Sequence, residues 1–101
     1  MFVVTNRLNV APENAAEFER VFSASMRDTL GGVPGLIRST LQRPVADSLP
    51  YISTMEFTSR EDFGAWLKSD SFRASHSNVE ANSLTTSSVV EQHTIIEDLS
   101  A

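Results

Sequence analysis

His76 is the residue of this sequence whose side chain is best suited to metal binding or acid–base chemistry. An imidazole can bind iron or act as a general base, and the chain has two histidines and no cysteine. Phe72 precedes it by four residues, so a helix would place both side chains on one face. The alternative is a partly exposed histidine that only complements a helix dipole. His93 is the other candidate, but a strand position near Glu91 favours a role in the sheet or at an interface.

Asn6 and Trp66 are the next residues of interest, and each has two readings. Asn6 is the only polar side chain on the apolar face of the first expected strand, and burying an amide without partners costs about 1 to 3 kcal/mol. Its amide could have a structural role and hydrogen-bond to the segment that follows a helix. Alternatively, it could donate its amide hydrogens to a bound oxygen species or a substrate carbonyl. Trp66 could be a core side chain or the wall of a site for a flat aromatic ligand.

Composition excludes several classes of site and partner. With no cysteine among 101 residues, disulfides, zinc–thiolate and iron–sulfur sites are excluded. The net charge of -5 and the scattered basic residues argue against nucleic acid or an anionic membrane as partner. No apolar run approaches the roughly 20 residues of a membrane helix, and no charged leader is evident. We therefore expect a cytoplasmic protein with a small-molecule ligand.

The spacing of apolar residues predicts the elements that must position these side chains. Strands have alternating or β-branched sequences, and the expected ones are residues 2–10, 36–43, 51–57 and 89–97. A first helix over 13–30 is expected from an apolar stripe formed by Phe18, Val21, Phe22, Met26 and Leu30. A second begins at Arg60, after an N-cap at Ser59, and a short third follows Ser69. Residues 77–88, rich in Ser, Thr and Asn, are expected to form a surface loop.

The order of these elements predicts the architecture. It is β-α-β-β-α-β with the second helix divided, which is the ferredoxin-like order of an α+β fold. A four-stranded antiparallel sheet then carries its helices on one face, in one domain over residues 1–101. The other face would show Val3 and Thr5, and the last strand is apolar on both sides. We therefore expect a homodimer whose two sheets close into an α+β barrel.

The segment from Phe63 to His76, together with Asn6 and its neighbours, resembles the antibiotic biosynthesis monooxygenase superfamily. Within it, the chain is similar to the haem-degrading monooxygenases of the iron-regulated surface determinant type. The specific feature is an asparagine in the first strand combined with Trp66 and His76 in the pattern W-x-x-S-x-x-F-x-x-x-H. The resemblance extends over essentially the whole chain.

This resemblance implies a role for each of the three residues. His76 would be the proximal ligand of haem iron, Asn6 would hydrogen-bond the oxygen species on the distal side, and Trp66 would press the porphyrin out of plane. Phe22 matches a position that lines the haem pocket. The expected walls of the haem cleft, which would gain affinity from apolar burial, are Phe22, Phe63, Trp66 and Phe72.

The same resemblance implies the reaction and its co-reactants. Haem would be both cofactor and substrate, opened by O2 with electrons from an external donor, either a reductase or a small reductant. Two alternatives stay open. One is a cofactor-independent monooxygenase acting on polycyclic phenols, in which His76 has no role, and the other is a dimer that binds haem without degrading it.

Overall fold

The computed structural model describes residues 1–77 and 83–100. Its four strands form one antiparallel sheet in the order β2-β3-β1-β4. The strands are β1 (Phe2–Val10), β2 (Leu36–Gln42), β3 (Tyr51–Phe57) and β4 (Thr85–Thr94). The helices are a 3-10 turn, η1 (Pro12–Asn14), followed by α1 (Ala15–Thr29), α2 (Arg60–Leu67) and α3 (Asp70–His76). The predicted α+β, ferredoxin-like order is confirmed.

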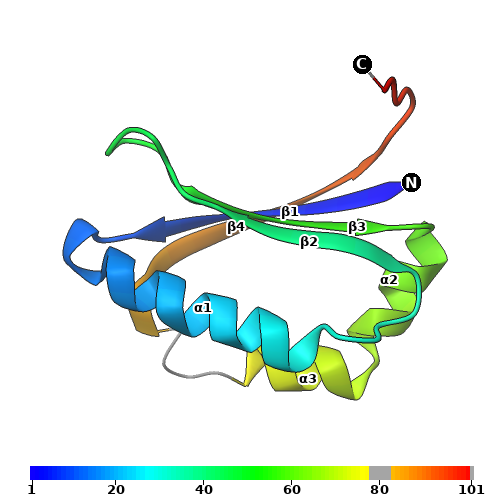
Figure 1. Cartoon of the computed structure of the whole chain (residues 1–101), viewed down its shortest axis with the longest axis horizontal. Coiled ribbons are helices and arrows are strands. Elements are labelled where there is room, and N and C mark those ends of the chain that lie inside the picture. Colours follow the sequence, from blue (N-terminus) through cyan, green and yellow to red (C-terminus); the bar gives the residue numbers. More distant parts are fainter. Residues whose placement is uncertain (78–82, 101) are drawn as a thin grey trace.

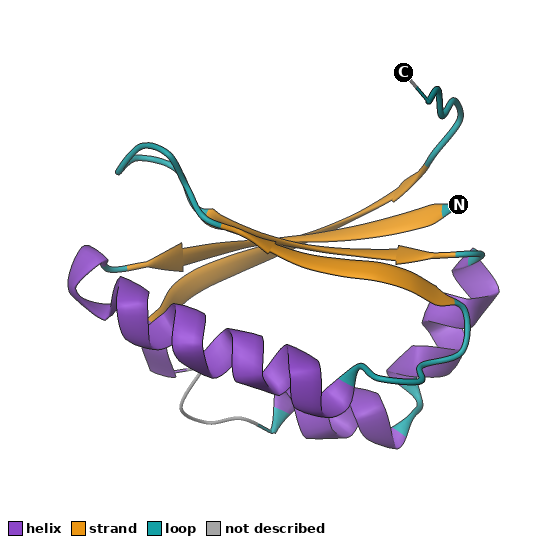
Figure 2. Cartoon of the chain, viewed as in Figure 1, coloured by secondary structure: helices purple, strands orange, loops and turns teal. Residues whose placement is uncertain are grey.

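The labelled helices lie in one layer against a single face of the sheet (Figures 1 and 2). On the opposite side, the hairpin between β2 and β3 and the C-terminal segment both project away from the helices (Figure 1). Among the described residues, no helix covers that outer face. None of the described helices has the length and apolar character needed to cross a bilayer.

Local capping sets the ends of the two short helices as predicted. Ser59 Oγ accepts a hydrogen bond from the Asp62 amide at 3.1 Å, and α2 begins at Arg60. Ser69 Oγ accepts from the Phe72 amide at 3.2 Å, and α3 follows. The first helix starts later than predicted, because Pro12 leads a 3-10 turn before α1 begins.

The last strand differs from the prediction at both ends. It begins at Thr85, so the expected loop over 77–88 is wrong for its final residues; residues 78–82 lie outside the described part. Side chains explain the earlier start, because Asn9 Nδ2 donates to Ser87 Oγ at 2.8 Å and Thr86 Oγ1 donates to the Asn9 carbonyl at 3.0 Å. β4 ends at Thr94 rather than at residue 97, and Ile96 is 97% exposed.

The apolar core consists of two clusters rather than one. The first, which we call the Trp66 cluster, contains the buried residues Phe2, Val4, Phe57, Phe63 and Trp66. The second, which we call the Phe18 cluster, contains Leu8, Phe18 and Tyr51, with Phe22 packed against it. Along β1, Val4 belongs to the first cluster and Leu8 to the second. Asn6 lies between them on the same face.

Candidate functional site

Asn6 is positioned by the centre of the sheet. It pairs with Ser53 of β3 on one side and with Val90 of β4 on the other. Its Oδ1 atom is buried and has no hydrogen-bond partner among the described residues. Ser53 is only 9% exposed, so the helix-facing side of the sheet carries polar side chains where the two core clusters separate. A buried acceptor without a partner is costly unless a ligand completes it.

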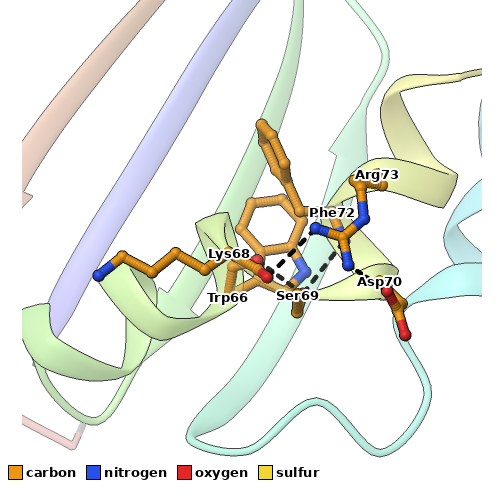
Figure 3. Close-up of polar contacts among 6 residues, drawn as sticks. All are labelled: Trp66, Lys68, Ser69, Asp70, Phe72 and Arg73. Atoms are coloured by element: carbon orange, nitrogen blue, oxygen red, sulfur yellow. Dashed lines mark hydrogen bonds and ion pairs between the residues drawn. The ribbon is translucent and has the colours of Figure 1, made fainter.

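Trp66 is positioned by three helices. Its indole Nε1 donates to Ser71 Oγ at 3.0 Å, and Ser71 Oγ donates to the carbonyl of Thr29, at the end of α1, at 2.5 Å. The backbone of Trp66 is held as well, because Ser69 Oγ donates to its carbonyl at 2.6 Å (Figure 3). Trp66 is 6% exposed and belongs to the Trp66 cluster, so its side chain is part of the core.

His76 lies on the last turn of α3 and packs on aromatic rings. Its ring centroid is 4.1 Å from that of Phe72 and 6.1 Å from that of Trp66. Its Nδ1 atom is 3.1 Å from the Phe72 carbonyl and 2.9 Å from Ser75 Oγ. Since a carbonyl can only accept, this contact assigns the proton to Nδ1, and in the neutral ring Nε2 then carries the lone pair that a metal requires.

The structure brings four of the six predicted site residues into one series of ring contacts. The ring centroid of Trp66 is 6.1 Å from that of Phe63 and 5.1 Å from that of Phe72, and the Phe72 ring contacts the His76 ring. Figure 3 shows the Phe72 side chain beside the indole. Phe63 is 7% exposed and packs on Phe2 and Phe57, so in the ligand-free chain its ring serves the core. Its role as a cleft wall stays a prediction.

The other two predicted residues, Phe22 and Asn6, lie apart from this series. Phe22 packs on Phe18 of the second core cluster, with 5.3 Å between ring centroids. Among the contacts of residues 1–77 and 83–100, none joins Asn6 to His76. Asn6 and His76 both adjoin the Trp66 cluster. The neighbour of Asn6 on the same sheet face is Val4, a member of this cluster, and the imidazole of His76 contacts Trp66, another member.

Two hollows adjoin the helices. One of about 260 Å³ lies between α1 and α3 and is lined by Val21, Ser25, Thr29 and Ala74, among others. The other, of about 250 Å³, lies beside Trp66 and is lined mainly by the turn from Gly31 to Pro34, together with Ala65 and Ser71. Neither is lined by Asn6, Phe22 or His76.

A charged cluster joins α1 to the sheet beside the Phe18 cluster. Arg43 donates two hydrogen bonds to the Glu19 carboxylate, at 2.8 and 2.6 Å, and the Tyr51 hydroxyl donates a third at 2.5 Å. The hydrogen bonds from Arg43 and then from Tyr51 lower the pKa of Glu19 to about 2. Burial is the largest reason why the pKa of Tyr51 is raised, followed by its bond to Glu19. The Tyr51 ring packs on Phe18 at 4.9 Å.

Sequence reasoning missed Ser71 and Ser53. The sequence shows Ser71 only as a serine near the start of the third helix, after Ser69 and Asp70. Its hydrogen-bond partner Thr29 is 42 residues away, so no local pattern indicates the contact. Ser53 sits opposite Asn6 in the sheet, and an alternating strand with one serine on its apolar face was the available signal. His93 is exposed and lies on the outer face of the sheet, opposite Val3, as its strand position predicted.

Comparisons with known proteins agree with this architecture. The family model described as antibiotic biosynthesis monooxygenase matches residues 1–78. A Staphylococcus aureus protein named heme oxygenase (staphylobilin-producing) 1 is 29% identical over 97 residues, covering 94% of this chain and 89% of that protein.

Two solved structures share this fold. A variant of MhuD from Mycobacterium tuberculosis, with two manganese protoporphyrin IX molecules bound per active site, is 25% identical with a TM-score of 0.84, and each chain is covered completely. SnoaB, a cofactor-independent oxygenase from Streptomyces nogalater, is 26% identical with a TM-score of 0.79, and the match covers 97% of this chain and 95% of that one.

Proposed function

Because this chain belongs to the antibiotic biosynthesis monooxygenase family, we propose that it binds haem and opens the porphyrin ring with O2, releasing iron. The names of the Staphylococcus aureus heme oxygenase and of the porphyrin-bound MhuD variant support haem as the substrate. The observation that carries the proposal is the buried Oδ1 of Asn6, which has no partner among the described residues and faces the helix layer between the two core clusters.

His76 is the proposed protein ligand of the iron. Haem iron would take a protein nitrogen as ligand, and His76 would supply it. The contact between His76 Nδ1 and the Phe72 carbonyl would orient the ring, and it supports Nε2 as the proposed ligating atom. Phe72 lies against the imidazole and against Trp66, so three aromatic side chains would meet one side of the ligand.

Asn6 and Trp66 have complementary proposed roles. When bound, haem would supply the iron centre at which O2 and electrons from an external reductant meet. The Asn6 carboxamide would donate its N–H groups to an oxygen species bound with the haem, and its buried Oδ1 would need a donor that no described residue supplies. Trp66 would press on the porphyrin plane, and Phe22 would line the pocket from α1.

Haem would enter between the Trp66 cluster and the Phe18 cluster, at the position of Asn6. Val4 and Leu8 pack into different clusters, and Asn6 separates them without a hydrogen bond at Oδ1. A haem placed there would gain apolar contacts with both clusters.

The proposed enzyme is a homodimer that pairs the outer faces of its sheets. Val89 lies on that face and is 55% exposed, and Val3 and Ile52 share it. The charges on the face are paired, because Arg7 donates to Glu91 at 2.9 Å and Arg38 donates to Glu56 at 2.7 Å. A face that combines exposed valine with paired charges could contact a second copy of this chain.

A haemin titration tests the proposal. Purified protein should give a saturable Soret band of histidine-ligated haem, which should bleach when ascorbate is added in air. His76→Ala should abolish the band. His93→Ala is the matched control, because it removes the other histidine from the outer face and should leave the band unchanged. A wild-type protein with no saturable Soret shift would refute the proposal.

A second candidate is a cofactor-independent oxygenase that acts on polycyclic phenols, and the similarity to SnoaB favours it. Oxygen uptake with an anthrone-like phenol, in protein stripped of haem and metals and unaffected by His76→Ala, would establish this activity. A Soret band that persists with reductant and air would instead identify a haem-binding protein without turnover.

A further inference from the structure

Ser71 occupies an unusual position in the hydrogen-bonding of the helix layer. Its hydroxyl proton is given to the Thr29 carbonyl at 2.5 Å, so the remaining lone pairs face the indole N–H of Trp66 at 3.0 Å. One hydroxyl thereby joins α1, α2 and α3. Because both its donor and its acceptor directions are used, Ser71 fixes the direction in which the indole nitrogen points.

The packing around Trp66 shows why this bond matters. Within the core, the ring centroids of Phe57 and Phe63 each lie 6.1 Å from that of the Trp66 indole. The Phe72 ring packs nearly edge-on against the indole, with 85° between the ring planes. The hollow of about 250 Å³ adjoins both Trp66 and Ser71. Rings therefore restrict the indole on its core side, whereas beside the hollow the Ser71 hydroxyl holds it.

We infer that Ser71 is a positioning residue that sets the orientation of the Trp66 indole, and through it the pressure of that ring on a bound porphyrin. The first part concerns the ligand-free chain, and the second rests on the proposed function. Ser71 has no assigned contact with the ligand and acts through Trp66.

The ligand-free part can be measured by fluorescence, because Trp66 is the only tryptophan in the chain. In Ser71→Ala the indole N–H loses its acceptor, and the ring should turn toward the hollow. We expect a lower emission anisotropy and an acrylamide quenching constant about twofold higher, because an indole without its hydrogen-bond acceptor reaches solvent more often. Ser71→Thr keeps the hydroxyl and should restore wild-type values.

Ser77→Ala is the matched control. Its hydroxyl donates to the Ala74 carbonyl at 3.0 Å near the end of the same helix and does not contact the indole. This variant should match the wild type in anisotropy and quenching. Circular dichroism and urea unfolding of all three variants identify any that fails to fold, and Ser71→Thr decides the question if Ser71→Ala does not fold.

The second part is measured with haemin. Ser71→Ala should keep a haemin dissociation constant close to the wild-type value, while the bleaching rate per bound haem falls about tenfold with the misplaced ring. Unchanged Trp66 fluorescence in Ser71→Ala would overturn the inference. Altered fluorescence with an unchanged bleaching rate would overturn the catalytic part. Absence of haemin binding by the wild type refutes the proposed function and that catalytic part, and fluorescence still decides whether Ser71 sets the indole.

Discussion

Replacing Glu19 by Gln should remove a pH-dependent part of the stability of this fold. In the folded chain the Glu19 carboxylate accepts hydrogen bonds from Arg43 and Tyr51, which tie α1 to the sheet. The bond from Arg43 and then that from Tyr51 lower the pKa of Glu19 from 4.5 to about 2. The folded chain therefore binds fewer protons than the unfolded chain between these two values.

The sign and size of the effect follow from this difference. Because the folded pKa is the lower one, the stabilisation is fully present above pH 4.5 and is lost as the pH falls through about 2. The difference in pKa corresponds to at most about 3 kcal/mol. Since the Arg43 side chain is 74% exposed, water screens the pair, and we expect roughly 1 kcal/mol in experiment.

Urea unfolding followed by Trp66 fluorescence measures this contribution. Between about pH 6 and pH 2.5, the wild type should lose roughly 1 kcal/mol more unfolding free energy than Glu19→Gln. Asp28→Asn is the matched control on the same helix, because it removes an exposed carboxylate from α1. It should follow the wild-type curve. If Glu19→Gln also lost stability in parallel with the wild type, the assigned role of the carboxylate would be wrong.

Substitutions at three further positions test the fold itself, each by the unfolding free energy measured in urea. Ser59→Ala removes the N-cap of α2 and should lower the unfolding free energy by about 1 kcal/mol, and Ser59→Asp should recover most of it. Gly35→Ala should destabilise by more than about 1 kcal/mol, because Gly35 has φ +77° and a Cβ atom there would overlap the Asp62 side chain; equal stability would contradict this. Phe57→Ala should lower the unfolding free energy by about 3 to 5 kcal/mol, since Phe57 has no exposed surface, whereas Phe57→Leu should lower it less.

Elements specified by nearby residues could be predicted from the sequence. The bounds of β1 and β3 match the prediction, and the hydroxyls of Ser59 and Ser69 cap their helices as expected. The start of β4 could not be predicted, because Ser87 is polar and gains its place from a bond to Asn9, 78 residues away. Pairing across such a separation leaves no periodic signal in the sequence.

The candidate site divides in the same way. Asn6 attracted interest as a polar residue on an apolar face, and the structure confirms that its Oδ1 is buried. The spacing of Phe72 and His76 predicted their shared helix face, which the ring contact confirms. The anchoring of Trp66 by Ser71 depends on how α1 lies over α3, a tertiary contact that helix periodicity does not specify.

The separation of the core at Asn6 has a thermodynamic consequence for the ligand-free protein. An unpartnered buried amide costs about 1 to 3 kcal/mol, a sizeable fraction of the roughly 5 to 15 kcal/mol that keeps a domain folded. Filling that position with Asn6→Leu should join the two clusters and raise the thermal unfolding midpoint, although oxygenase activity should disappear. A lower midpoint would show that the wild-type amide contributes to folding. A higher midpoint would show that the wild-type chain keeps a destabilising side chain at the centre of its sheet.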